Sequence, residues 1–132
     1  MTRDSRSLSR TEIATMVEDM AALIGDSLGS DDPIPWAYYS FPKGTLTSTP
    51  FLIYYFSGND DFKADNLNYA TIENLIIELY SENVNFGLED VIQNVMNDHY
   101  MNYTKTFSFI ESEEMYLTRY ESEVLIYNGE QG

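Results

Sequence analysis

The chain contains no cysteine, few basic residues and no long apolar run. Without cysteine, the sequence excludes disulfide bonds, thiolate catalysis and cysteine-ligated metal. No stretch of about 18 apolar residues is present and the first residues are polar, so we expect neither a membrane-spanning helix nor a signal peptide. The simplest expectation is therefore a protein made in the cytosol that has no membrane partner.

Carboxylates outnumber basic residues by 22 to 7, which gives the chain a net charge of −15. Within residues 1–10, Arg3, Arg6 and Arg10 stand against Asp4, so this segment carries +2 and the remainder carries −17. Such an acidic body repels phosphate and will not bind nucleic acid in the ordinary way. The acidity can serve solubility alone, line a passage through which DNA slides without sticking, or imitate DNA.

Length and composition fit one folded domain over residues 11–127. A chain of 132 residues can bury about two thirds of its unfolded surface, and 43% hydrophobic residues supply a core. Residues 1–10, with serines between the arginines, are typical of a flexible basic arm. Residues 128–132 are predicted to form a flexible tail.

The run Phe51–Phe56 consists of six large apolar or aromatic residues and follows Pro50. It is too short for a helix, and it presents apolar side chains on both of its faces. We expect a strand in the middle of a sheet, covered on both sides. Residues 34–41 predict a second strand, paired with the first as an antiparallel hairpin. Pro35 lacks an N–H group, which places this second strand at a sheet edge.

Two amphipathic helices are predicted from apolar stripes at helical spacing. Ser9 and Glu12 have the spacing of a capping box, which begins the first helix, and Gly25 ends it. The second helix follows Gly87. The stripe of the first helix is Ile13, Met16, Val17, Met20, Ala21 and Ile24, and the stripe of the second is Leu88, Val91, Ile92, Val95, Met96 and Tyr100.

The apolar spacing of residues 72–80 fits both a helix and a strand that is buried on both faces. The turn-like residues 81–83 and the strand-rich surroundings favour the strand. Alternating side chains then predict strands over residues 104–110 and 115–126, the first with Lys105, Phe107 and Phe109 on one face. The resulting order, helix–strand–strand–strand–helix–strand–strand, is that of an α/β (α+β) two-layer domain with a mixed or mostly antiparallel sheet.

Catalytic signals are weak. The only histidine, His99, falls at the end of the second helix, where capping or solvent exposure explains it better than catalysis. Glu111, Glu113 and Glu114 could act as paired carboxylates, but a solvated hairpin turn is the better interpretation. The sequence has no glycine-rich phosphate loop and no metal-binding constellation. We expect no enzyme activity, no cofactor and no bound metal.

Residues 59–68 are the most polar insert within the body. The first, third and fifth residues of this insert invite comparison with a calcium loop. The comparison fails because the sixth position is not glycine and the twelfth is Ala70 instead of glutamate. An acidic loop that becomes ordered on a partner, with Phe62 as an apolar anchor, is the better interpretation.

The order of several segments resembles that of small tail-terminator proteins, which lie in the neck of long-tailed phages of Gram-positive bacteria. None of the segments is a catalytic motif, and their order over residues 11–126 carries the resemblance. The segments are IPWAYYSFP at 34–42, PFLIYY at 50–55, ADNLNY at 64–69, IELYSE at 77–82, LEDVI at 88–92 and FIESEEMY at 109–116. In that family the IELY segment is a strand, which supports a strand over 72–80. Residues 1–10 and 29–32 find no counterpart.

The resemblance implies a homo-oligomeric ring, typically of six copies, that caps the tail tube in the virion. Such a ring stops the major tail protein from polymerising and offers the head-completion or connector protein a docking surface. DNA passes through its lumen without specific binding. The candidate contacts with tube or connector are Asn59, Asp60, Asp61, Phe62, Lys63 and Asp65, and also Trp36, for which core packing is the better interpretation.

Two alternatives stay open. Another neck component, such as a head-completion or stopper protein, would share the size and acidity and would dock on the portal side. An acidic DNA mimic would instead inhibit a basic host nuclease, in a complex that salt weakens.

Overall fold

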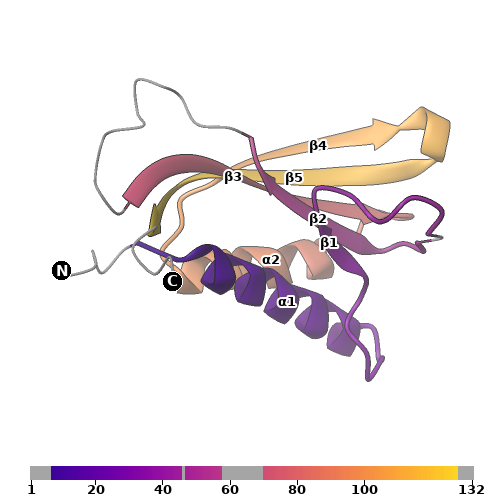
Figure 1. Ribbon diagram of the computed structural model, residues 1–132. Helices are drawn as coiled ribbons and strands as arrows, with labels where there is room; N and C mark the ends of the chain where they lie inside the picture. Colours follow the sequence, from indigo (N-terminus) through magenta and orange to yellow (C-terminus); the bar gives the residue numbers. More distant parts are fainter. Residues whose placement is uncertain (1–6, 46, 58–69, 128–132) are drawn as a thin grey trace.

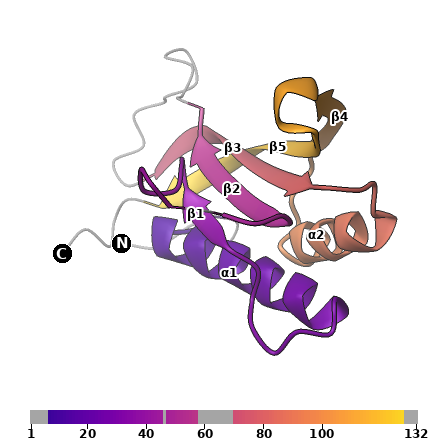
Figure 2. The same ribbon diagram turned by 90° about the vertical axis from the view of Figure 1, so that its right-hand side faces the viewer.

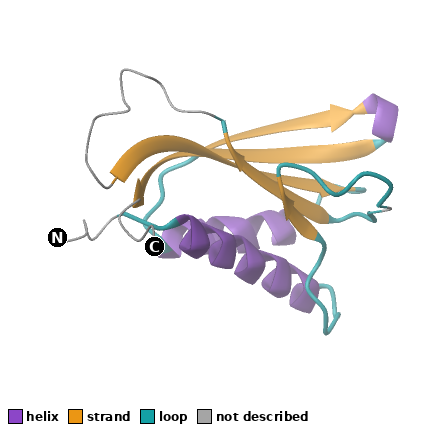
Figure 3. Cartoon of the chain, in the orientation of Figure 1, coloured by secondary structure: helices purple, strands orange, loops and turns teal. Residues whose placement is uncertain are grey.

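A computed structural model describes residues 7–45, 47–57 and 70–127 of the chain. They form an α+β domain of two layers, in which a five-stranded mixed sheet carries two helices on one of its faces (Figure 1; Figure 3). The predicted fold class and the predicted order of helices and strands are confirmed. The other face of the sheet, called the open face below, bears no helix among these residues (Figure 2).

The sheet has the strand order β1-β2-β3-β5-β4. β3 (Ala70–Ser81) is the central strand, and it pairs antiparallel with both β2 (Phe51–Phe56) and β5 (Met115–Tyr127). β4 (Thr104–Ile110) pairs antiparallel with β5 and forms one edge, and β1 (Trp36–Tyr38) forms the other. The segment 72–80, ambiguous from its apolar spacing, is therefore a strand, as expected.

The first helix, α1 (Arg10–Ser27), begins as the sequence predicts. The Ser9 hydroxyl accepts a hydrogen bond from the Glu12 N–H at 3.0 Å, and the Glu12 carboxylate accepts one from the Ser9 N–H at 2.9 Å, which completes the capping box. The predicted apolar stripe is buried in full. The predicted end at Gly25 is wrong, because the helix continues to Ser27 and buries Gly25 within it.

Gly25 allows the backbone of a neighbouring segment to pack closely against α1, and it does not end the helix. A Cβ at this position would lie 2.1 Å from the backbone carbonyl oxygen of Asp32, which belongs to the segment that returns beneath α1. That segment is fixed by two hydrogen bonds, from the Ser30 N–H to the Gly25 carbonyl oxygen and from the Ile34 N–H to the Ala21 carbonyl oxygen.

We expect Gly25→Ala to destabilise the protein by about 1–3 kcal/mol, because the backbone of Asp32 must move to admit the methyl group. In an open helix the same substitution would stabilise by about 1 kcal/mol. Urea unfolding measures the difference. The matched control is Gly87→Ala in α2, where the added Cβ would meet only the Asn85 side chain, at 3.2 Å. Equal stability of the two variants would contradict the packing role of Gly25.

The strand predicted over residues 34–41 is only three residues long, and it runs parallel to β2 instead of forming an antiparallel hairpin with it. Its position at the sheet edge is as expected. The strand ends because Tyr39 adopts a left-handed conformation, with φ 70°, and its N–H donates to the Tyr54 carbonyl oxygen. The chain then crosses the open face, where the Phe41 ring meets the Phe51 ring at 5.4 Å. This return lets β2 start beside β1 in the same direction.

The second helix, α2 (Phe86–Asp98), begins at the N-cap Asn85, whose side chain accepts hydrogen bonds from two backbone N–H groups. Gly87 therefore lies inside its first turn. Tyr100, predicted to belong to the buried stripe, is 93% exposed. The reason is that the helix ends before it, with His99 as the C-cap and Tyr100 at φ 58°.

The core lies between the helices and the sheet. It combines the α1 and α2 stripes with one face of β2, β3 and β5. The centre of β2, residues 52–54, is buried on both faces of the sheet, as predicted for this strand.

Of the predicted arm, residues 1–6 lie outside the described residues, whereas residues 7–10 belong to the folded body. Leu8 bridges to Ile126 of β5 through two backbone hydrogen bonds of 2.9 and 2.7 Å. Ser9 caps α1, and Arg10 is its first residue. The predicted tail, residues 128–132, also lies outside the described part of the chain.

Candidate interaction surface

Of the residues predicted from the sequence to contact partners, Trp36 is the one that lies within the described part of the chain. Asn59 to Asp65 lie outside the described residues. Trp36 is half-buried on β1 and packs against the core, with its ring 6.2 Å from that of Tyr54. Core packing, the better of the two interpretations of Trp36, is what its environment supports.

The β4–β5 hairpin is the most exposed part of the sheet. It runs beyond the helices at one end of the molecule and closes through a short 3₁₀ turn, Glu111–Glu113 (Figure 1). Glu114 follows in the left-handed conformation. Six of the seven residues of β4 are exposed and the last is half-buried, so this strand contributes little to the core.

Aromatic side chains cluster on one face of this hairpin. Phe107 and Phe109 are each 48% exposed, and their rings lie 5.4 and 4.9 Å from that of Tyr116 on β5. We call these three residues the hairpin aromatic face. It points to the helix side of the sheet, because Lys105 on the same face of β4 reaches Glu89 of α2. Phe107 and Phe109 lie farther along the hairpin than Lys105, and the described residues leave each of these two rings 48% exposed.

The sequence correctly placed Phe107 and Phe109 on one face, but it gave no sign that they would be exposed. Their exposure depends on how far the hairpin extends past α2, which is a tertiary feature. A strand with alternating aromatic residues is usually buried on that face, and the sequence pattern here looks the same.

The outer edge of β4 pairs with no other strand in the described part of the chain. It is seven residues long and contains neither proline nor a bulge among the paired positions. β1 at the opposite edge is three residues long and follows Pro35. Proteins commonly shorten or interrupt edge strands, or place lysine on them, to prevent pairing with other chains. Among the described strands, β4 is thus the longer and less interrupted edge, with Lys105 as its one charged residue.

A polar cluster lies on the open face around the buried Glu78. Its carboxylate accepts hydrogen bonds from the Tyr80 hydroxyl at 2.7 Å and the Tyr55 hydroxyl at 3.1 Å. The Nε atom of Arg119 lies 3.8 Å from the same carboxylate, and its Nη2 donates to the Tyr55 hydroxyl at 3.3 Å. Three strands meet through these side chains, which fixes their register from the open side.

Four tyrosines have a pKa above the ordinary value, chiefly because burial disfavours the phenolate: Tyr54, Tyr55, Tyr80 and Tyr120. Contact with Glu78 adds to the rise for two of them, Tyr55 and Tyr80. Because the pKa of each of these tyrosines is higher in the folded state than in the unfolded state, their contribution to folding stability is fully present below about pH 10 and is lost as the pH rises above it.

We therefore expect the urea midpoint to fall steadily above about pH 10. Tyr120→Phe removes the ionisable group that is buried beneath α2 and makes the fall less steep. Tyr100→Phe, at a residue that is 93% exposed, leaves the slope unchanged. Circular dichroism at a series of pH values measures both, and equal slopes for the two variants would contradict the assignment.

Three of the four cations in residues 7–45, 47–57 and 70–127 neutralise buried glutamates. Arg10 contacts Glu73 at 2.6 Å, Lys105 contacts Glu89, and Arg119 lies beside Glu78. The side chains of these glutamates are 10%, 5% and 9% exposed. The scarce cations are thus used inside the fold, and the described surface keeps its negative charge.

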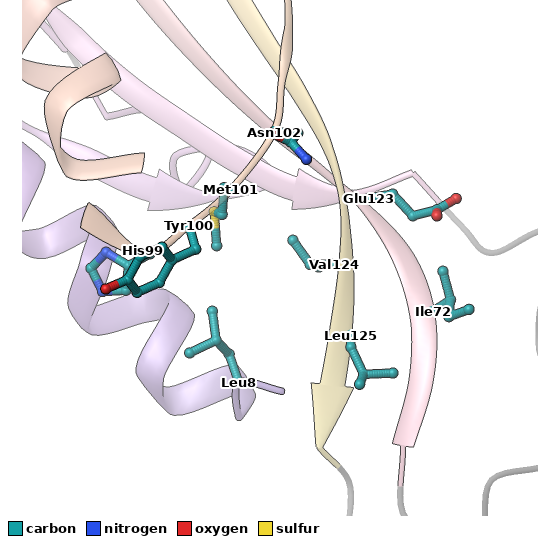
Figure 4. A pocket seen from close by; sticks show the side chains of 9 residues that line it. All are labelled: Leu8, Ile72, His99, Tyr100, Met101, Asn102, Glu123, Val124 and Leu125. Atoms are coloured by element: carbon teal, nitrogen blue, oxygen red, sulfur yellow. The ribbon is translucent and has the colours of Figure 1, made fainter. Parts of the chain in front are cut away.

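A groove of about 490 Å³ lies between the end of α2 and the last residues of β5 (Figure 4). Leu8 forms one side, residues 99–102 after α2 form another, and residues 123–125 of β5 and Ile72 complete it. His99 lies on its wall, exposed to solvent, and its Nδ1 is 2.9 Å from the Val95 carbonyl oxygen. This contact agrees with a capping role for His99.

The described residues contain no group of three or more histidines or carboxylates that could hold a metal ion. No helix in this part of the chain is long and apolar enough to cross a membrane. The sequence matches neither a protein-family model nor a curated protein.

Proposed function

We propose that this protein is a structural component of a phage neck that forms a ring on the end of the tail tube and stops the tube from growing. The exposed β4–β5 hairpin carries the proposal, since it presents three aromatic rings and an open strand edge that a second chain can cover. The kind of assembly, a ring on a tail tube, is inferred from the resemblance of six ordered segments to tail-terminator proteins. In the virion, the opposite side of the ring docks the head connector.

A ring needs an interface between unlike surfaces that closes by rotation. The exposed hairpin supplies one surface that projects from the body, as such an interface requires. Contacts around the ring and to the tube then add, because each copy binds at a high effective concentration of its neighbours.

The ring would surround a lumen through which DNA passes. The distribution of charge in the chain supports such a lumen. Phosphates are held by lysine and arginine, and three of the four cations in the described residues are occupied by Glu73, Glu78 and Glu89. A ring built from this chain would repel the DNA that passes through it.

Negative-stain imaging of tail tubes tests the proposal. The major tail protein of the same phage is allowed to polymerise with and without this protein. We expect added protein to leave short tubes with a ring at one end. Tubes of unchanged length with bare ends would contradict the proposal, and binding to the isolated head connector would then favour a stopper protein.

A further inference from the structure

We propose that Arg3 and Arg6 of one copy dock on the hairpin aromatic face of the next copy and hold neighbouring copies of the ring together. The proposal rests on the self-assembly part of the proposed function and names the two segments that meet. One is the basic segment of residues 1–6, called the arm below, which lies outside the described residues. The other is the β4–β5 hairpin with its turn.

The hairpin combines aromatic rings with carboxylates. Its rings contact one another, and Phe107 and Phe109 are each 48% exposed. The turn between Phe109 and Tyr116 carries three exposed glutamates, Glu111, Glu113 and Glu114. The face of an aromatic ring attracts a cation, and a carboxylate binds the N–H groups of a guanidinium. A surface that presents both groups is therefore suited to an arginine side chain.

The same chemistry already occurs inside the fold. The guanidinium carbon of Arg10 lies 4.9 Å from the centre of the Phe56 ring, and the same side chain pairs with the Glu73 carboxylate at 2.6 Å. One arginine thus uses a ring and a carboxylate together. Arginine suits such a place better than lysine, because its planar group stacks on a ring while its N–H groups bind the carboxylate.

The distribution of charge indicates which segment of a second copy the hairpin attracts. In a chain with 22 carboxylates and 7 basic residues, the bodies of two copies repel each other. Three of the four cations in the described residues pair with buried glutamates. The arm, in contrast, carries Arg3 and Arg6 against the single carboxylate of Asp4. Docking the arm on the acidic turn therefore replaces repulsion between two copies with attraction.

The reach of the arm excludes the hairpin of its own chain. Leu8 bridges to Ile126, close to the end of β5, whereas Tyr116 lies close to its start. The strand between them spans about 33 Å at roughly 3.3 Å per residue. Arg3 precedes Leu8 by five residues, which extend to at most about 18 Å. The difference is longer than an arginine side chain. The start of α1 and the hairpin turn accordingly lie at opposite ends of the molecule (Figure 1).

The position of the two segments decides the form of the assembly. A contact between two hairpins would give a symmetric dimer and stop there. An arm that docks on the hairpin of the next copy leaves one arm and one hairpin still to be used at the two ends. Contacts of this kind lead to a closed ring or to an open chain.

Thiol crosslinking tests the contact, because the absence of cysteine makes every introduced thiol unique. Ser5→Cys places a thiol between the two arginines, and Ser112→Cys places one in the exposed turn of the hairpin. Thr15→Cys, on the exposed side of α1, is the matched control. The variants are mixed in pairs at high protein concentration and low salt with a short bis-maleimide crosslinker, and a denaturing gel measures the dimer.

We expect the mixture of S5C and S112C to give at least about tenfold more crosslinked dimer than S5C with T15C. Salt at about 0.5 M should remove most of this difference, because it screens exposed charges. Equal yields with S112C and T15C would overturn the proposal. A crosslink within one chain of the double variant S5C/S112C would also overturn it, and so would crosslinking of S112C to the major tail protein in place of S5C.

Substitution of the arginines identifies the groups that make the contact. Arg3→Gln with Arg6→Gln, introduced into S5C, should abolish the dimer with S112C. Arg3→Lys with Arg6→Lys should retain part of it, because lysine keeps the charge and lacks the planar group. Circular dichroism checks that each variant is folded. A dimer yield that none of these substitutions changes would reject Arg3 and Arg6 as the docking residues.

The outcome is independent of tube capping. Protein that caps tubes without the S5C–S112C crosslink would retain the proposed function and reject this contact. The crosslink without tube capping would retain the contact and reject the function.

Discussion

We expect protein in which Phe107 and Phe109 are both replaced by serine to fold and no longer to cap tail tubes. The two side chains are each 48% exposed in the single chain, so only about half of their apolar surface stabilises its own fold. Complete burial of a phenylalanine is worth about 1.5–3 kcal/mol, and half of that remains available, about 1 kcal/mol for each ring. A contact between two copies would lose about 2 kcal/mol, and a ring of six would lose roughly 12 kcal/mol.

Thermal unfolding followed by circular dichroism checks the fold of this double variant, and negative-stain imaging checks tube length. The matched control replaces Thr106 and Ser108, on the other face of the same strand, with alanine, and we expect it to cap tubes as the wild type does. Full capping by the phenylalanine variant, or its failure to fold, would contradict the assignment of these rings to an interface.

The second large effect concerns the ion pair at the base of the hairpin. Lys105 of β4 contacts Glu89 of α2, whose side chain is only 5% exposed. Lys105→Met leaves a buried carboxylate without its cation, which costs about 3 kcal/mol in similar sites. We expect the free energy of unfolding to fall by no more than about this amount, because the Lys105 side chain is 35% exposed and water screens part of the pair.

A double-mutant cycle separates the pair from its parts. Glu89→Leu combined with Lys105→Met removes both charges and should recover most of the stability, since an apolar pair of similar volume often replaces a buried ion pair without loss. Urea unfolding of the four proteins gives the coupling energy. A double variant that is as unstable as Lys105→Met alone would show that the loss comes from packing instead of from the unpaired charge.

Local signals in the sequence were sufficient for the helices and for most strands. The capping box at Ser9 and Glu12 identified the start of α1 to the residue, because both partners lie within one turn. The end of the helix was misplaced because a glycine that ends a helix and a glycine that admits a neighbouring backbone look alike in sequence. The contact of Gly25 with Asp32 exists only in three dimensions.

The pairing of β1 could not be predicted from local patterns. Two short apolar runs separated by a loop fit a hairpin, and the return of the chain across the open face depends on ring contacts of Tyr39 and Phe41 with residues of β2. The same limit applies to the interaction surfaces. Alternation placed Phe107 and Phe109 on one face, but the groove is assembled from segments more than 100 residues apart, as Leu8 and Leu125 illustrate.

The bridge between Leu8 and Ile126 ties the segment that enters α1 to the last strand of the sheet. Because the two residues are far apart in the sequence, forming this contact closes a long loop of chain and costs conformational entropy. Leu8 and residues 123–125 of β5 also line the groove together. A change that releases Leu8 from β5 would therefore remove one wall of the groove and, in the same step, free the backbone next to the capping box of α1.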